Sequence, residues 1–235
     1  MSSAGTGCDM TEEELLAMLR GIDSGKIKKQ GRDLAGAEDP AEGAGPAQGQ
    51  NCETVDSFLE MNEEDGDFNQ YWYSKPSINK MVEETRAEAG RPMKVAFLST
   101  PSIFFSLSEE EREQCVVLDF DRKWEAIPGF QFYDFNDPEG LPAEMHHAFE
   151  MLVIDPPFIT REVWEKYTTT AKLLLQPGGK LLCSTVDENA EMMKELLDVH
   201  TNVFRPRIPN LVYQYSFYTN YASEGLSQVN QEIGF

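Results

Sequence analysis

The sequence predicts an α/β fold built on a mostly parallel sheet with helices on both faces. From about residue 67 onward, short and nearly continuous apolar runs alternate with helical patterns, which is typical of strands buried on both faces. The length of 235 residues suits one domain with appendages. No run of about 18 or more apolar residues occurs, so we expect no membrane span.

We expect the chain to divide into three parts. Residues 1–25 form a helical appendage, in which Met10–Ile22 has the pattern of a short amphipathic helix with a capping box. Residues 26–60 form a flexible linker, because the stretch up to Gln50 is rich in Gly, Ala and Pro and has almost no large apolar residue. Residues 61–235 form the folded domain.

Within the domain, the elements are expected in the following order. The first is a helix that places Ile78, Met81 and Val82 on one face. Five apolar strands follow: Lys94–Ser99, Cys115–Asp121, Phe130–Phe135, Phe149–Phe158 and Gly179–Thr185. The last elements, residues 201–209 and 211–221, resemble two strands joined by a turn, and the second alternates with period two. An antiparallel hairpin is therefore expected to close the parallel sheet.

Charge and cysteine content indicate where the protein acts and on what. The formal net charge is −21, and residues beyond 60 hold 29 of the 41 acids and 15 of the 20 bases. A folded part this acidic disfavours nucleic acid, which is bound through Lys and Arg, and favours a basic protein partner. Four scattered cysteines without a CxxC pair suggest a reducing, cytoplasmic environment and no metal site; they are Cys8, Cys52, Cys115 and Cys183. We also expect a monomer.

Polar residues follow the first four predicted strands. Ligands of open parallel sheets bind outside the carboxyl ends of the strands, where this chain carries Ser99, Thr100, Pro101, Asp119, Asp121, Asp134 and Asp155. Asp119 and Asp121 are placed where dinucleotide-binding folds hold a ribose. Each aspartate has the alternative of a turn former or helix cap. The first loop reads "STPS" rather than a glycine-rich fingerprint, which argues against an NAD enzyme.

The fourth strand ends in Asp155-Pro156-Pro157-Phe158, which suggests chemistry on an amine. Consecutive prolines form a rigid turn without backbone donors, leaving carbonyls to accept hydrogen bonds. Together with the Asp155 carboxylate and the Phe158 ring, such a turn can orient an amine and stabilise the positive charge that develops when nitrogen attacks carbon. These are the requirements of methyl transfer to nitrogen. The alternative is a simple proline stop after a core strand.

The segment "LVIDPPF" resembles the [D/N]-P-P-[F/Y/W] motif of S-adenosylmethionine-dependent amino-methyltransferases of class I, whose fold is Rossmann-like with seven strands. The resemblance extends from about Asp67 to Tyr221. Within this range the chain resembles the eukaryotic elongation factor 1-alpha lysine methyltransferase 1 family, whose members were first catalogued as N6-adenine DNA methyltransferases. The segments that carry the resemblance occur in the same order as in that family: "NQYWYS", "LSTPSIFF", "LDFDRKW", "FYDFNDP", "DPPF" and "GGKLLCST".

The resemblance implies roles for the predicted site residues. Asp119 would hold the ribose of S-adenosylmethionine, Asp134 would lie near the adenine, and the loop that begins at Ser99 would replace the glycines of other class I enzymes. The turn from Asp155 to Phe158 would bind the amine. Aromatic residues of the "NQYWYS" segment would cover the cofactor or the substrate channel, or serve only as packing: Tyr71, Trp72 and Tyr73.

The predicted function is therefore methylation of a lysine of elongation factor 1-alpha. A lysine ammonium has a pKa near about 10.4, and no His or Lys in the motifs is an obvious base, so we expect loss of the proton to solvent, helped by desolvation. One alternative is N6-methylation of adenine, since such a motif also serves flipped bases. Another is a non-catalytic binding protein that keeps the fold.

Overall fold

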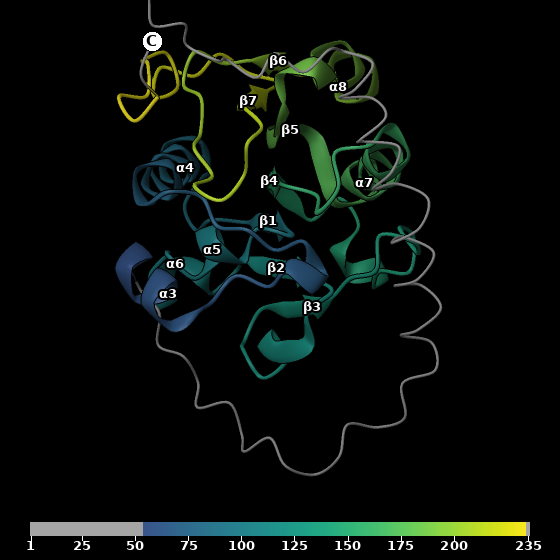
Figure 1. The fold of residues 1–235 in the computed structure, drawn as a ribbon. Coiled ribbons are helices and arrows are strands. Elements are labelled where there is room, and N and C mark those ends of the chain that lie inside the picture. Colours follow the sequence, from purple (N-terminus) through teal and green to yellow (C-terminus); the bar gives the residue numbers. More distant parts are fainter. Residues whose placement is uncertain (1–53, 234–235) are drawn as a thin grey trace, which may run out of the picture. The chain divides into compact units, whose positions relative to one another are not determined.

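A seven-stranded sheet forms the centre of the part of the chain that the structure, a computed structural model, describes, residues 54–233 (Figure 1). The strand order is β3-β2-β1-β4-β5-β7-β6. The strands are β1 (Val95–Leu98), β2 (Val116–Asp119), β3 (Phe130–Phe132), β4 (Phe149–Ile154), β5 (Leu175–Val186), β6 (His200–Thr201) and β7 (Tyr215–Thr219). The first five run parallel to one another, and β7 pairs antiparallel with both β5 and β6. The mostly parallel sheet with antiparallel strands at its C-terminal end is confirmed.

The register of the central strands places their carboxyl ends side by side. Leu98 at the end of β1 pairs with Leu118 of β2 on one side and with Ile154 of β4 on the other. All residues of β1 are buried, as expected of a central strand covered on both faces. Ser99 and Asp155, which follow β1 and β4, and Asp119, the last residue of β2, therefore lie at the same end of the sheet.

Helices cover both faces of the sheet. In Figure 1, α3 (Val55–Met61), α4 (Lys75–Glu88), α5 (Pro101–Phe104) and α6 (Glu109–Arg112) lie on one side, while α7 (Arg161–Leu174) and α8 (Ala190–Leu197) lie on the other. Short 3₁₀ turns complete the described chain: η1 (Gly66–Phe68), η2 (Arg122–Trp124), η3 (Ala143–Met145) and η4 (Asp187–Asn189). None of the described helices combines the length and the apolar character of a membrane span.

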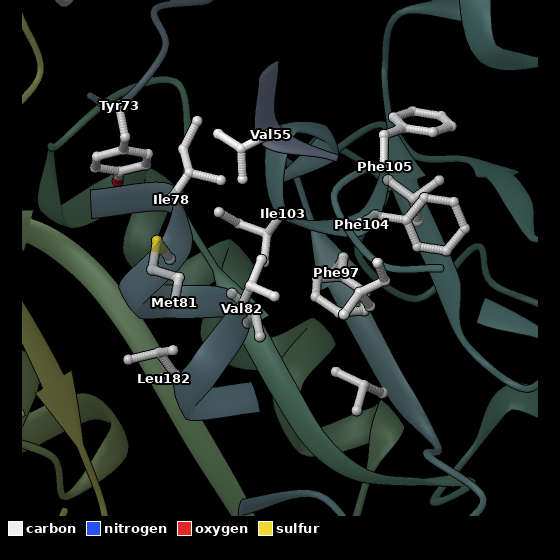
Figure 2. Close-up of a cluster of buried hydrophobic side chains, with 14 of the residues drawn as sticks. Val55, Tyr73, Ile78, Met81, Val82, Phe97, Ile103, Phe104, Phe105 and Leu182 are labelled. Carbon is white, nitrogen blue, oxygen red and sulfur yellow. The ribbon is translucent and has the colours of Figure 1, made fainter. Parts of the chain in front are cut away.

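The main core cluster lies between α4, α5 and the sheet. Ile78, Met81 and Val82 of α4 are buried in it, which confirms the predicted apolar face of that helix. Figure 2 shows these side chains beside residues of β1, α5 and β5, and it also shows Tyr73 among the members of the cluster. The two cysteines of the described chain, Cys115 and Cys183, are buried free thiols.

Two predicted boundaries differ from the structure. The predicted linker ended at residue 60, yet α3 begins at Val55, and Val55 and Phe58 are buried in the core. Thr54 caps this helix through a capping box with Ser57. The folded unit therefore begins before residue 61. The predicted helix at Met10–Ile22 and the linker stretch up to Gln50 lie outside the described residues.

The first strand of the C-terminal hairpin is also shorter than predicted. β6 contains only His200 and Thr201, and residues 203–214 run irregularly before β7 begins. Pro206 and Pro209 lack the backbone donor that a strand in a ladder requires. The apolar residues Val203, Phe204 and Ile208 near these prolines were therefore a misleading strand signal, although the antiparallel arrangement itself is confirmed.

Candidate active site

The loop after β1 adopts a conformation that favours glycine without containing one. Ser99 has a φ of 55°, in the left-handed region, and its N–H donates to the Leu118 carbonyl. Its hydroxyl lies 2.6 Å from the hydroxyl of Tyr167. Thr100 and Pro101 are buried, and Pro101 is the first residue of α5. The loop thus makes the sharp turn expected at this edge, with a serine in the strained position.

The four aspartates after the strands separate into two kinds. Asp121 caps η2 by accepting from the Lys123 N–H, and it forms an ion pair with the Lys123 ammonium. Asp134 accepts from the backbone and side-chain amides of Asn136. These two side chains therefore have local turn-forming roles, the alternative noted for each aspartate from the sequence. Asp119 and Asp155 differ, because neither forms an ion pair within residues 54–233.

Asp119 is a buried carboxyl at the end of β2. The residue is 7% exposed, and its carboxylate accepts from the Asp121 N–H. Burial raises the pKa of Asp119 to about 7, and the nearby Asp121 carboxylate adds to the rise, while the hydrogen bond from Asp121 opposes it. Further hydrogen-bond donors from a ligand would stabilise the ionised form of such a carboxylate.

Asp155 follows β4 and is bonded to a tyrosine far away in the sequence. The Tyr73 hydroxyl donates to Asp155 Oδ2 at 2.6 Å and lies 2.7 Å from the hydroxyl oxygen of Ser184. Burial raises the pKa of Asp155 to about 7, and the bond from Tyr73 acts in the opposite direction. Burial and the Asp155 charge together raise the pKa of Tyr73 well above its usual value. Tyr73 therefore stays protonated as the donor of this pair.

The proline turn is also held on its other side. The side-chain amide of Asn69 donates to the Pro157 carbonyl, so this carbonyl is not left open as the sequence suggested. Pro156 is buried, and Phe158 is buried with its ring edge-on to Phe135 at 6.3 Å between centroids. The turn is thus a rigid part of the fold, and Asp155 is its side-chain acceptor.

The three aromatic residues of the "NQYWYS" segment have different surroundings. Trp72 packs edge-on against Phe58 at 5.0 Å, and its indole N–H donates to the Asn62 carbonyl, so packing explains it. Tyr71 is half-buried against the core cluster. Only Tyr73 contacts the proline turn through a side-chain hydrogen bond. The structure thus brings one of the three to the predicted site.

Several site residues were not predicted from the sequence. They are Asn69, Tyr167 and Ser184, which contact Pro157, Ser99 and Tyr73 respectively. Tyr167 lies on α7 and Ser184 on β5, and both are buried. In the sequence, Tyr167 has the helical spacing of a core residue, and Ser184 lies within an apolar strand. Only the fold shows that both side chains contact the site. Across residues 54–233, no three His, Cys, Asp or Glu side chains gather to hold a metal ion.

Comparisons with known proteins converge on methyltransferases. A family model described as probable N6-adenine methyltransferase matches residues 64–223, which include every predicted site residue. EEF1A lysine methyltransferase 1 of Danio rerio is 35% identical over 166 residues, which cover 67% of this chain and 99% of that protein. The Gallus gallus protein of the same name is 33% identical over 188 residues, covering 77% of this chain and 85% of its own.

A solved structure shares the fold. The branched-chain polyamine synthase of Thermus thermophilus, determined with N4-aminopropylspermidine and 5'-methylthioadenosine, superposes with a TM-score of 0.51. The alignment covers 78% of this chain and 71% of that enzyme at 18% identity. At this identity the likeness concerns the Rossmann-like architecture alone.

Proposed function

Since this chain belongs to the EEF1A lysine methyltransferase 1 family, we propose that it transfers a methyl group from S-adenosylmethionine to a lysine of elongation factor 1-alpha. The observation that carries this function is the intact Asp-Pro-Pro-Phe turn, whose acid is half-buried and hydrogen-bonded at the same end of the sheet as Asp119. The turn provides an amine-binding group, and the neighbouring acid provides a ribose-binding group.

The residues at this edge suit S-adenosylmethionine. Asp119 is buried with a raised pKa, and ribose hydroxyls donating to it would stabilise its ionised form. We propose that Asp134 lies on the adenine side, and that the loop of Ser99, Thr100 and Pro101 lies against the cofactor. Because Asp121 is bonded to Lys123, we assign it a supporting role at the cofactor site. When bound, the cofactor supplies a methyl group on a positively charged sulfur.

The Asp155 turn would prepare the amine for attack. A lysine ammonium has a pKa near about 10.4 and must lose a proton first; desolvation on entering the site lowers that pKa. Asp155 then accepts an N–H of the neutral amine, orients its lone pair, and stabilises the positive charge that develops on nitrogen. Since Asn69 occupies the Pro157 carbonyl, the Pro156 carbonyl is the backbone acceptor we assign to the amine. The Phe158 ring borders the site.

Cellular setting and assembly belong to the same proposal. We propose that the enzyme works in the cytoplasm, where free buried thiols such as Cys115 and Cys183 are usual. We also propose that it acts as a monomer. The acidic domain suits a substrate whose lysine lies on a basic surface, because opposite fields speed association.

Methylation of adenine N6 is the competing function for the same turn, since it also places an amine next to a proline carbonyl and an aromatic ring. The names of the relatives and the acidity of the domain disfavour it. A groove for nucleic acid requires clustered Lys and Arg. The nature of the substrate can be tested directly.

Replacing the Asp155 carboxylate tests the amine site. We predict that Asp155→Ala lowers turnover by about 100-fold or more, because it removes the acceptor that orients the amine and stabilises the transition state. Affinity for S-adenosylmethionine, measured by calorimetry, stays within about threefold of wild type, since the acid assigned to the cofactor is Asp119. The matched control, Asp56→Ala, removes an exposed carboxylate and leaves both values unchanged. Full turnover by Asp155→Ala would show that this turn does not bind the amine.

A further inference from the structure

We propose that Tyr73 is a positioning residue for methyl transfer, which together with Ser184 holds the Asp155 carboxylate in the orientation that receives the amine. The proposal deepens the function proposed above and rests on it for the identity of the amine. Tyr73 acts through Asp155, and it need not touch either substrate.

Tyr73, Ser184 and the half-buried Asp155 form a hydrogen-bonded chain. Tyr73 and Ser184 are 3% and 1% exposed, and the phenol oxygen is within 2.6 Å of Asp155 Oδ2 and 2.7 Å of Ser184 Oγ. A phenol has a single proton, and a carboxylate can only accept. When Asp155 is ionised, Tyr73 therefore donates to it, and the Ser184 hydroxyl is left to donate to the phenol oxygen. Each member fixes the direction of the next.

The fold prevents Tyr73 from moving away. Its ring belongs to the core cluster in Figure 2 and packs against Phe217 of β7 at 6.3 Å between centroids. The next residue, Ser74, is the N-cap of α4, and its N–H donates to the Arg207 carbonyl. Because both the ring and the backbone of Tyr73 are fixed, its hydroxyl can hold a carboxylate in one orientation, which a mobile water cannot do.

The same segment holds the other end of the proline turn. Asn69 donates to the Pro157 carbonyl, while Tyr73 donates to the Asp155 carboxylate. Two side chains of the "NQYWYS" segment therefore hold the turn, Tyr73 at Asp155 and Asn69 at Pro157. This arrangement accounts for a conspicuous sequence motif whose tryptophan, Trp72, is used for packing.

The charge state of Asp155 depends on this contact. Its titratable neighbours are Tyr73 from the segment before α4, Tyr167 from α7, Cys183 from β5 and Tyr215 from β7. Burial raises the pKa of each of these groups, so all are neutral near pH 7, and none is a cation. Asp155 itself has a pKa of about 7, which the Tyr73 bond holds down against burial. Loss of the phenol proton donor therefore raises that pKa further.

The test uses Tyr73→Phe, which keeps the ring in the core, and Ser184→Ala, which removes the second link. The control is Tyr218→Phe, which removes another buried tyrosine hydroxyl that donates to the Val186 carbonyl. At pH 7, we expect Tyr73→Phe to lower kcat/KM by about tenfold or more. The ratio of variant to wild type rises between pH 7 and pH 9 as Asp155 ionises again. Ser184→Ala shows a smaller change in the same direction.

A second readout does not depend on activity. Titration of ¹³C-labelled aspartate carboxyls by NMR, with the Asp155 signal assigned through Asp155→Asn, should show a higher pKa for Asp155 in Tyr73→Phe than in wild type. Tyr218→Phe should leave that pKa and the pH profile unchanged. An unchanged pKa in Tyr73→Phe, or a pH-independent loss equal to that in Tyr218→Phe, would overturn the proposal. Wild-type protein inactive on elongation factor 1-alpha would instead count against the proposed function, while the titration still decides the role of Tyr73.

Discussion

Two carboxyl groups, those of Asp119 and Asp155, lie at the carboxyl ends of β2 and β4, on either side of β1, and in residues 54–233 neither forms an ion pair. Burial raises the pKa of each to about 7, so both change charge within the physiological range. Ionising either group where water is largely excluded costs stability, and hydrogen bonds from a ligand can offset that cost. We therefore assign one to the cofactor's ribose and the other to the amine.

Cofactor affinity should depend on pH through Asp119. Ribose hydroxyls donate more strongly to a carboxylate than to a carboxyl, so the ionised form binds better. Because the pKa of free Asp119 is about 7, we predict that affinity for S-adenosylmethionine rises from pH 5.5 to pH 7 and then levels off. Well below pH 7 the change approaches about tenfold per pH unit. Calorimetry across this range measures it.

Matched variants separate the two acids in that experiment. Asp119→Asn should bind the cofactor weakly and lose the pH dependence, whereas Asp155→Asn should keep it. If Asp119→Asn retained wild-type affinity with an unchanged pH profile, Asp119 could not be the ribose-binding acid.

At the residue scale, the sequence indicated where the site lies but not how its members differ. The four aspartates looked equivalent, and only the fold shows that Asp121 and Asp134 are bonded locally, whereas burial raises the pKa of Asp119 and of Asp155 to about 7. The missing glycine in the first loop suggested a departure from related folds. The chain nevertheless makes the same kind of turn, because Ser99 adopts a positive φ and is bonded to Tyr167.

At the scale of elements, α3 supports the segment that reaches the site. Phe58 is fully buried and packs against Trp72, Phe105 and Trp124, with ring centroids within 5.0, 6.1 and 6.2 Å. Trp72 directly precedes Tyr73. The helix therefore helps fix the backbone from which the Tyr73 hydroxyl is directed at Asp155.

Removing the Phe58 ring should destabilise the whole folded unit. We predict that Phe58→Ala lowers the free energy of unfolding by about 3–5 kcal/mol, the usual cost of a cavity left by a buried aromatic ring. Glu60→Ala, on the exposed side of the same helix, should change it by less than about 0.5 kcal/mol. Denaturant unfolding measures both. Equal, small effects would mean that α3 is the end of a linker, as the composition suggested, and not a part of the core.

Elements with a local signal were predictable, and those fixed by distant contacts were not. The five parallel strands were found because each is an apolar run bounded by polar residues. α3 was missed because a seven-residue helix next to a Gly- and Pro-rich stretch has too short a pattern to stand out. The bond from Tyr73 to Asp155 joins residues 82 positions apart, and the one from Asn69 to Pro157 joins residues 88 apart. Sequence periodicity cannot predict contacts between residues so far apart in the chain.

At the scale of the molecule, the net charge bears on the choice of substrate. The chain carries a formal charge of −21, and most of the acids lie in the part that folds. Nucleic acid would be repelled at long range, whereas a basic protein surface would be attracted. In the function proposed above, the proline turn binds the amine, and the net negative charge of the chain favours a protein lysine over a base as its substrate.

The most direct measurement offers both substrates to the enzyme with S-adenosylmethionine that carries a labelled methyl group. Purified elongation factor 1-alpha, adenine-containing DNA and RNA are incubated separately with wild type and with Asp155→Ala, and labelled protein is analysed by mass spectrometry. We predict label on a lysine of elongation factor 1-alpha, resistant to nuclease, with wild type alone. Label on adenine N6 with an unmethylated elongation factor 1-alpha would contradict the account.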